Sequence, residues 1–500
     1  MFAKEIFDNC MNFYLDNVTN SLLFFTFAHC FFFTTFYFGG MVIKIHRGLN
    51  QIGGCITEIS TETSRIFIDL GQNLPGIGER PNPEKDKALV DNLFSNNIRT
   101  NQTVVYTHAH NDHVVLFEYV PDNIPQIIGE GAKKMLIIKY DAIFKGRQYQ
   151  LNILIGKDVE SEEIEHQKLL LDEDASRLAK IKEFRIWKRP SIEIYKKKES
   201  LIQNLIKIWK KEEKSRFTIG DIKITPFPTC HSIYDSYMFL IEAEGKRIWH
   251  MGDYRRHGYQ GQEMMDVLYS YAKDIDLLIT EGTMLLHEDD CIDENSISLL
   301  MQKTMEENKY VFILSSLTDI ERLASIKEAA KRIGKDLYVC SRMTYRMMGH
   351  FHSREASKSK GLFSFHPKCY DETLHLESMK ERGFAMIVGI PNLKMVMNIV
   401  SKLSSEEVIL VYSTWDGYYK EPEQIEINPN YKLFRDSFSR VIDIHTSGHA
   451  DRKTITSVIS IVNPSTAVVG IHKEASASLV SLPLEKDIKS KIVNVSEIQL

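Results

Sequence analysis

The sequence predicts an α/β protein of two or three domains, and three observations lead to this fold class. The chain has 500 residues, which exceeds the size of one ordinary hydrophobic core. From about residue 275 to residue 440, apolar runs of strand length alternate with stretches of helix length. This alternation is typical of a parallel sheet covered by helices. Several of the apolar runs also end in Gly, Asp or His, so polar residues are expected at strand ends.

The expected elements of the first half are mainly strands. Alternating or continuous apolar runs predict strands at 42–46, 55–59, 65–70, 102–107, 221–225, 237–242 and 247–250. Residues 133–214 differ, because they are rich in Lys, Glu, Leu and Ile and hold few Gly or Pro. This composition predicts a mainly helical insertion.

In the second half, strands and helices alternate. Strands are expected at 276–280, 310–315, 336–340, 384–388, 407–412, 440–444 and 466–471. Helices are expected between them, at 319–332, 391–402 and 451–462. No internal repeat and no long low-complexity linker interrupts this order.

Composition sets limits on function and compartment. The chain is 43% hydrophobic and 26% charged, as ordinary soluble globular proteins are. A formal net charge of −5 gives no overall attraction to nucleic acid, so any such binding has to come from a local basic face. The seven cysteines are scattered without a Cys-x-x-Cys pair, which predicts a reducing, cytoplasmic location.

One such basic stretch is residues 180–214, where Trp187 and Trp209 are interleaved with Lys and Arg. It could grip a nucleic-acid backbone. Acidic residues are mixed through it, however, which favours a solvated helical face.

The N-terminal segment 21–40 is twenty residues without a charge, which is long enough to span a bilayer. Met41 follows at once and begins a plausible first strand. We favour a translation start at Met41, with residues 1–40 as a doubtful extension. The alternative is a membrane anchor, and a membrane is an expected partner only in that case.

Residues 108–113 read His-Ala-His-Asn-Asp-His and directly follow an expected strand. Neutral imidazoles and carboxylates are ligands that divalent zinc, manganese or iron prefer. A short loop can turn His108 and His110 to one ion, while Asp112 and His113 face a second. The alternative is a polar loop with incidental histidines, but a buried cluster of imidazoles would then need many hydrogen-bond partners.

Three later residues can complete a two-metal centre. His231 lies shortly after the strand 221–225, Asp253 follows the strand at 247–250, and His472 ends the strand at 466–471. Alone, each is more typical of a turn or surface residue. Together with the cluster at 108–113, they form an ordered set of metal ligands.

This order, His-x-His-x-Asp-His, a distant His, Gly-Asp and a late His, resembles the metallo-β-lactamase fold. The resemblance implies an αββα sandwich with two divalent ions at its edge, most plausibly Zn²⁺ with Mn²⁺ as the alternative. It implies that one ion is held by His108, His110 and His231, and the other by Asp112, His113 and His472. Asp253 would bridge the two ions, and a bridging hydroxide would be the nucleophile.

The stretch between Asp253 and His472 narrows the resemblance to the β-CASP branch, and most closely to ribonuclease J. An α/β domain is inserted there, Glu281 follows the next strand in Ile-Thr-Glu-Gly-Thr, and His449 lies in His-Thr-Ser-Gly-His-Ala. The resemblance implies a metallo-β-lactamase domain in two segments, 41–270 and 441–500, and a β-CASP-like parallel α/β domain at 271–440.

The implied reaction is two-metal hydrolysis of a nucleic-acid phosphodiester, with RNA or single-stranded DNA as substrate and a homodimer left open. Asp112, Glu281 and His449 are assigned to catalysis. His449 would protonate the leaving oxygen, and Glu281 would orient His449 and raise its pKa. The alternative makes His449 a support for the ligands and Glu281 a cap residue.

Four further residues are expected near the centre. Ser232 and Asp235 match the family's His-Ser-x-x-Asp pattern and are expected to shape the turn or support the ligands. Ser447 and Gly448 could offer backbone donors to a phosphate, or could form a simple strand-to-helix turn.

Two features depart from ribonuclease J. Only 28 residues follow His472, and the insertion at 133–214 has no obvious counterpart. Two rival functions therefore stay open, a hydrolase of a small phosphoester, ester or thioester and a binding protein without activity. The seven intact ligand positions argue against the second, and fold analogy alone decides neither.

Overall fold

The structure is a computed structural model that describes residues 40–74, 80–95, 99–156, 161–188, 216–288 and 290–500. Within it, Met41–Leu500 is one compact unit. The uncharged segment at 21–40, apart from Gly40, and Trp209 lie outside the described residues. No helix in the described ranges combines the length and apolarity that crossing a bilayer requires.

Two seven-stranded sheets carry the N-terminal half and the C-terminal end of the chain. The first has the order β20 (Glu497–Gln499), β1 (Val42–Arg47), β2 (Ile56–Ser60), β3 (Ser64–Ile68), β4 (Asn101–Val105), β5 (Gln126–Gly129) and β6 (Arg185–Trp187). The second has the order β19 (Ile492–Val493), β18 (Ala467–Ile471), β11 (Leu277–Glu281), β10 (Lys246–His250), β9 (Tyr237–Ala243), β8 (Ile222–Pro228) and β7 (Phe217–Ile219).

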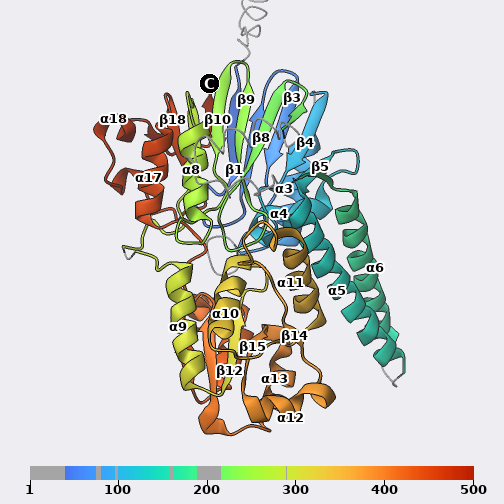
Figure 1. Cartoon of the computed structure of the whole chain (residues 1–500). Coiled ribbons are helices and arrows are strands. Elements are labelled where there is room, and N and C mark those ends of the chain that lie inside the picture. The colour runs from blue at the N-terminus through green and yellow to red at the C-terminus, as the bar shows by residue number, and fades with distance from the viewer. Residues whose placement is uncertain (1–39, 75–79, 96–98, 157–160, 189–215, 289) are drawn as a thin grey trace, which may run out of the picture. The chain divides into compact units, whose positions relative to one another are not determined.

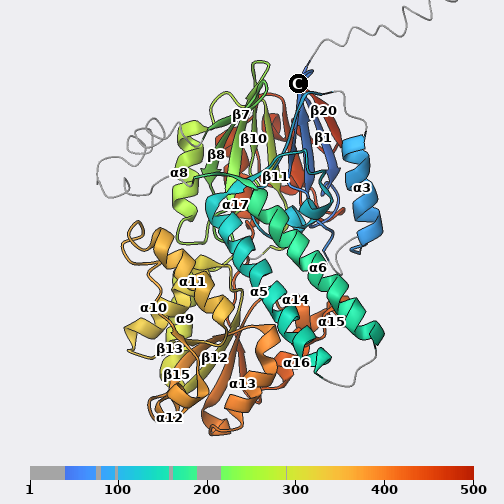
Figure 2. The ribbon, with the colours of Figure 1, turned by 90° about the vertical axis from the view of Figure 1, so that its right-hand side faces the viewer.

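These sheets pack face to face, because each presents every second side chain of its strands to the other. Ile43 and Ile66 of the first sheet share one buried cluster with Ile241 and Ile279 of the second. The outer face of the first sheet is covered by α3 (Pro83–Ser95) and the helices that follow β5, and that of the second by α8 (Gly261–Tyr271) and α17 (Arg452–Val462) (Figures 1 and 2). The layers therefore run helix, sheet, sheet, helix.

A third sheet is built between β11 and β18. Its six strands are β14 (Lys368–Cys369), β13 (Leu337–Val339), β15 (Phe384–Val388), β12 (Tyr310–Ser315), β16 (Val408–Ser413) and β17 (Val441–Asp443). Every pairing in it is parallel. The expected α/β class and the expected parallel sheet are therefore confirmed.

Helices cover both faces of this third sheet, because its strands are apolar on both sides. One face packs against α9 (Glu294–Glu307), α10 (Ile320–Arg332) and α11 (Arg342–Glu355). The other packs against α13 (Leu393–Val400), with α12 (Glu372–Arg382) and α16 (Asn430–Asp436) beside it. Short helices complete the described chain: α4 (Asn111–Val114), α14 (Gly417–Lys420), α15 (Pro422–Ile427) and α18 (Lys486–Lys489).

The expected helical insertion is a hairpin of two long helices, α5 (Glu130–Ile155) and α6 (Ser161–Glu183), which run side by side along the molecule (Figures 1 and 2). The expected solvated helical face at 180–214 is wrong at residues 185–187, because β6 there is a strand that extends the first sheet, and residues 189–214 lie outside the described part of the chain. Trp187 of β6 is 3% exposed, and its ring lies 5.1 Å from that of Tyr237 and 5.6 Å from that of Phe239. Trp187 is therefore a core residue and is not available to a nucleic acid.

A buried ion-pair cluster joins the second sheet to the helices of the third. Arg255, in the loop after β10, is completely buried and lies 3.2 Å from Glu294 Oε1, 3.2 Å from Asp319 Oδ1 and 3.1 Å from Glu321 Oε2. Arg322 Nη2 also lies 3.0 Å from Glu294 Oε1. Burial tends to raise the pKa of Glu294, but the two guanidiniums lower it to about 2. Burial raises the pKa of both Asp319 and Glu321.

We expect Arg255→Met to destabilise the protein by about 3–5 kcal/mol, because it leaves buried carboxylates without their cation. Urea unfolding followed by tryptophan fluorescence measures the change. Lys303→Met is the control, since Lys303 and Glu307 form an exposed pair at 3.9 Å, and its effect should stay within about 0.5 kcal/mol. An unchanged urea midpoint for Arg255→Met would contradict the structural role of the cluster.

Candidate metal centre

The seven residues expected as ligands lie together at one edge of the two packed sheets. Each follows the end of a strand, where the chain turns into a loop or helix. The loop after β4 and the short helix α4 supply His108, His110, Asp112 and His113. The loops after β8, β10 and β18 supply His231, Asp253 and His472. Residues up to 364 positions apart, from 108 to 472, therefore meet at one place.

Three imidazoles form the first group. His108 Nε2 lies 3.1 Å and His231 Nε2 lies 3.0 Å from His110 Nδ1. His231 Nδ1 lies 2.7 Å from the Gly448 carbonyl oxygen. A carbonyl oxygen only accepts hydrogen bonds, so Nδ1 carries the ring hydrogen and donates it. His108 Nδ1 lies 2.9 Å from Thr107 Oγ1, whose hydrogen goes to Asp69. The Nε2 atoms of His108 and His231 therefore carry no hydrogen. A single hydrogen on His110 Nδ1 cannot form a full hydrogen bond to both of them.

Asp112, His113, His472 and Asp253 form the second group. His113 Nδ1 donates to Asp69 Oδ2 at 2.7 Å, which directs its Nε2 at Asp253 Oδ2, 3.1 Å away. His472 Nδ1 lies 2.7 Å from Thr283 Oγ1, which also lies 3.1 Å from the His472 carbonyl oxygen. His472 Nε2 lies 3.0 Å from Asp112 Oδ2 and can donate to it when no metal is bound.

This arrangement fits divalent metal ions. Within the described residues, His113 Nε2 and Asp253 Oδ2 are buried without a hydrogen-bond partner. Asp253 Oδ2 also lies 3.6 Å from His231, 3.9 Å from His108 and 4.0 Å from His472. Ligand atoms around a tetrahedral zinc are about 3.3 Å apart. Converging lone pairs and carboxylate oxygens at such spacings repel one another unless a cation lies between them.

The pKa values of the centre follow from burial and from these close approaches. Burial lowers the pKa of His108 and His231 well below the usual range and that of His110 to about 4, so these imidazoles are neutral and can bind a metal. Burial also lowers the pKa of His113, but the carboxylates of Asp253, Asp69 and Asp112 raise it well above its usual value. Without a metal, a proton on His113 is thus the available counter-charge.

His449 and Glu281 lie beside this centre as a pair. His449 Nδ1 lies 2.9 Å from Glu281 Oε2 and 3.8 Å from Asp253 Oδ2. Burial lowers the pKa of His449, but Glu281 outweighs it and raises that pKa to about 9. The other oxygen of Glu281 accepts from the Tyr254 amide at 2.9 Å, so the carboxylate is fixed in place. The pair can hold a proton at neutral pH.

Sequence reasoning missed the residues that do not face the proposed metal site but orient its ligands through hydrogen bonds or close packing. Asp69 accepts from the Thr107 amide and hydroxyl, each at 2.7 Å, as well as from His113. Its φ of 62° is uncommon for any residue but glycine, although Asp tolerates it. Gly71 was also missed, and a Cβ there would lie 1.6 Å from the Asp112 carbonyl oxygen. The Asp-Leu-Gly sequence at 69–71, at the end of the expected strand, was the available signal.

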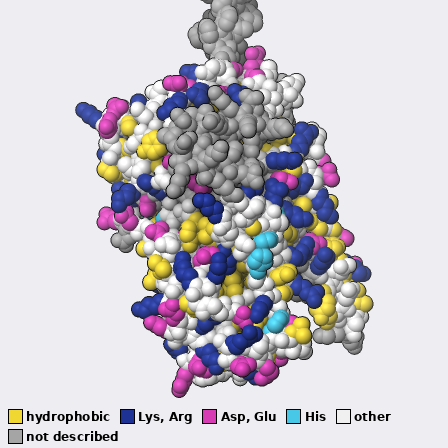
Figure 3. Space-filling view, viewed as in Figure 1, with side chains coloured by type: hydrophobic (Ala, Val, Ile, Leu, Met, Phe, Trp, Pro, Cys, Tyr) yellow, Lys and Arg dark blue, Asp and Glu magenta, His cyan; other side chains and the backbone are white. Residues whose placement is uncertain are grey.

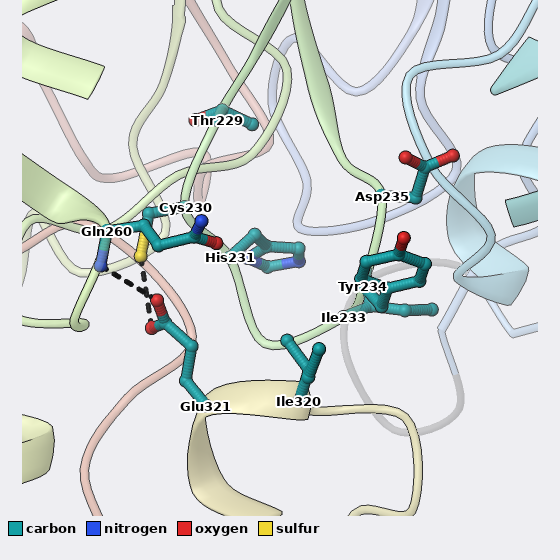
Figure 4. Close-up of a pocket in the computed structure, with 9 residues that line it drawn as sticks. All are labelled: Thr229, Cys230, His231, Ile233, Tyr234, Asp235, Gln260, Ile320 and Glu321. Carbon is teal, nitrogen blue, oxygen red and sulfur yellow. Dashed lines mark hydrogen bonds between the residues drawn. The ribbon is translucent and has the colours of Figure 1, made fainter. Parts of the chain in front are cut away.

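The loop that carries His231 is anchored on the helices of the third sheet (Figure 4). Cys230 Sγ lies 3.2 Å from Glu321 Oε2, and the Tyr234 amide donates to the Thr318 carbonyl at 3.0 Å. Asp235 accepts from the Ala132 amide at 3.0 Å and so caps α5, as a turn residue of this loop. The position of His231 therefore depends on two neighbouring parts of the fold.

Ser447 and Gly448 use their carbonyls within the protein. The Ser447 carbonyl accepts from His257 Nε2 at 2.6 Å and from Arg255 Nη1 at 3.3 Å. Gly448 packs so closely that a Cβ would lie 2.2 Å from Ser232 Oγ. The two residues thus form a tight turn that holds His449. Their expected role as phosphate donors stays a prediction.

Comparisons with curated proteins match only a short stretch of the chain. No protein-family model matches the chain. A stretch of 66 residues, 13% of the chain, is 41% identical to endoribonuclease YSH1 of Gibberella zeae and 39% identical to endoribonuclease ysh-1 of Neurospora crassa. It spans 8% and 7% of those proteins, so the chain matches less than a tenth of their length.

The fold is shared with a solved structure of unknown function from Enterococcus faecalis V583. That structure is 15% identical in sequence, with a TM-score of 0.60 over 92% of this chain and 100% of the other. At this identity the likeness concerns the fold alone.

We expect Asp69→Asn to weaken zinc binding about 10- to 100-fold, the usual cost of losing an outer partner of a metal ligand. An amide NH₂ facing His113 Nδ1 would move the ring hydrogen to Nε2 and remove the lone pair. Zinc titration against a competing chelator measures the affinity. Asp221→Asn is the control, because Asp221 accepts from the Thr61 and Thr63 hydroxyls instead. Equal affinity in both variants would contradict the role of Asp69.

Proposed function

We propose that this chain is a two-metal-dependent hydrolase that cleaves phosphodiester bonds of nucleic acid, a ribonuclease related to ribonuclease J. The observation that carries the proposal is the convergence of seven potential ligands on one buried place beside the His449–Glu281 pair. The identity of a short stretch with two endoribonucleases supports RNA as the substrate.

The layer order supports assignment to the metallo-β-lactamase fold with a β-CASP-like insertion. The helix–sheet–sheet–helix layers would be the sandwich, expected at residues 41–270 and 441–500, and the six-stranded parallel sheet with its helices would be the inserted domain, expected at 271–440. The strands shift both expected boundaries, because β11 at 277–281 belongs to the second sheet and β17 at 441–443 to the third. Glu281 at the end of β11 and His449 before α17 would then stand on either side of the insertion.

The proposed ligand sets are those expected from the sequence. His108, His110 and His231 would hold one ion, Asp112, His113 and His472 the other, and Asp253 both. Zinc suits this imidazole-rich set best, and manganese is the alternative. When bound, the ions supply an activated water and neutralise charge on the phosphate. Asp112 is assigned to catalysis as well as to ligation.

The chain's own residues would supply the proton. The raised pKa of His449 keeps its ring protonated at neutral pH, so His449 can donate to the leaving oxygen. Glu281 orients the ring through Nδ1 and leaves Nε2 as the donating atom. Thr283 Oγ1 lies 3.2 Å from His449 Nδ1 and 2.7 Å from His472 Nδ1, so it links the proton donor to a proposed ligand.

The face drawn in Figure 3 shows no continuous basic patch among its described side chains, because Lys and Arg are scattered among Asp and Glu. The net charge of −5 gives no overall attraction to a polyanion either. On this face, binding would therefore depend on contacts close to the centre.

We expect the chain from Met41 to cleave 5′-labelled single-stranded RNA when zinc or manganese is present, with single-stranded DNA tested beside it. His449→Ala should slow cleavage about 10²- to 10⁴-fold, the contribution of a general acid. Asp253→Ala should abolish cleavage and lower the metal content. Gel analysis of the products measures the rate and separates single cuts from stepwise trimming.

His166→Ala is the matched control, because His166 is exposed on α6 and should leave the rate unchanged. If the wild-type protein holds two metals and cleaves neither polymer, the proposal is wrong. Turnover of a small phosphoester or thioester by that same protein would then identify the alternative function.

A further inference from the structure

A second cluster of metal-binding side chains lies outside the centre described above. His257, Cys291 and Asp451 place one ligand atom each within 4.8 Å of one another. His257 comes from the loop between β10 and α8, Cys291 from the segment that leads into α9, and Asp451 from the start of α17. The cluster therefore connects three segments that are far apart in the sequence.

The ring of His257 is already oriented as a metal ligand requires. Its Nε2 lies 2.6 Å from the Ser447 carbonyl, so Nε2 carries the hydrogen and donates it. Metal-bound histidines commonly donate their second nitrogen to a carbonyl in this way. The other nitrogen, Nδ1, then has a bare lone pair. It is buried without a partner among the described residues, and the side chain is 9% exposed.

Asp451 has one carboxylate oxygen to spare. Its Oδ1 accepts from the Thr454 amide at 2.8 Å and caps α17, while no hydrogen bond within the described chain involves Oδ2. Cys291 is a free thiol of intermediate exposure, so a metal ion can reach it from solvent. A thiolate, a neutral imidazole and a carboxylate are a ligand set that zinc accepts.

The charges around the cluster are of both signs. At His257 the guanidinium of Arg255 acts more strongly than the carboxylates of Asp451 and Glu294. Arg255 is itself paired with Glu294, Asp319 and Glu321, which offsets part of its charge. Burial lowers the pKa of His257, and the nearby charge of Arg255 lowers this pKa further, to about 4. The imidazole is therefore neutral at neutral pH. Burial and Asp451 raise the pKa of Cys291, which a bound metal would reverse by displacing the proton.

We propose that His257, Cys291 and Asp451 bind one zinc-like divalent ion, with water as the fourth ligand. The ion would fasten the segment leading into the third sheet to the start of α17. Because His257 also donates to the Ser447 carbonyl, the ion would fix the turn that carries His449. The proposal rests on the geometry of these three residues and does not depend on nuclease activity.

The test counts zinc in the chain from Met41 after dialysis against metal-free buffer, by mass spectrometry of the element. Cys291→Ser and Asp451→Asn should each lose one zinc per chain. Asn is a good helix N-cap, so Asp451→Asn preserves α17. Cys291→His, which keeps a ligand, should retain the zinc. Cys369→Ser is the control, since Cys369 is also partly exposed but lies in β14.

A background that lacks the other centre separates the two sites. With His110→Ala and Asp253→Ala combined, the zinc that remains should still disappear on adding Cys291→Ser. Cobalt provides a second readout. The difference between the absorption spectra of the cobalt-loaded wild type and the cobalt-loaded Cys291→Ser variant should show thiolate-to-cobalt charge-transfer absorption in the near ultraviolet. Equal zinc in wild type, Cys291→Ser and Asp451→Asn, with no such difference spectrum, overturns the proposal.

Discussion

The centre depends on one constraint: four of the five imidazoles proposed as ligands have their outer nitrogen hydrogen-bonded to a fixed partner. Thr107, Asp69, Gly448 and Thr283 take this role for His108, His113, His231 and His472. The inner nitrogens then point toward carboxylate oxygens or toward one another. Buried lone pairs and anions at these distances cost several kcal/mol if nothing compensates them. The outer partners come from the ends of β3, β4 and β11 and from the turn before α17. The turns at this edge of both sheets are therefore required for the same centre.

The loop after β10 links this centre to the rest of the molecule. Within residues 253–257 it carries Asp253, the buried guanidinium of Arg255 and the imidazole of His257. Arg255 is paired with residues of α9 and α10 through Glu294 and Glu321. A shift of those helices would expose unpaired buried charges, so they and the loop are energetically coupled. The position of Asp253 is consequently tied to the third sheet, although that sheet contributes no ligand.

The sequence predicts which residues come together at this site better than it predicts the residues that hold them in orientation. Strand-end polar residues and the 108–113 motif were sufficient to identify the seven proposed ligands, because ligand type and order are local features, but they did not point to Cys55, which lies beside His113 and His472. The outer partners could not be found in this way. Asp69 and Thr283 are single residues whose role depends on which strands lie next to each other. The pairing of β3 with β4, which brings Asp69 to the ligands, is part of the tertiary structure and is not visible in the local sequence. The mainly helical prediction did not foresee the strand β6, because its three residues follow a long helical pattern. Trp187 was included in a predicted solvated helical face because acidic residues are mixed through the basic stretch 180–214. Tertiary packing overrode local composition there.

The turn Ser447–His449 is where these couplings meet. Its Ser447 carbonyl accepts from both Arg255 and His257, and its Gly448 carbonyl accepts from His231. Gly448 has no space for a side chain against Ser232, so the turn cannot relax without moving the His231 loop. His449 is thus held from three sides, by Glu281 at the end of β11, by the ligand loop after β8 and by the loop after β10. A proton donor has to stay within hydrogen-bond reach of its acceptor to act. The turn at the junction of the packed sheets and the third sheet would meet that requirement for the proposed role of His449, because its hydrogen bonds hold the ring in one place.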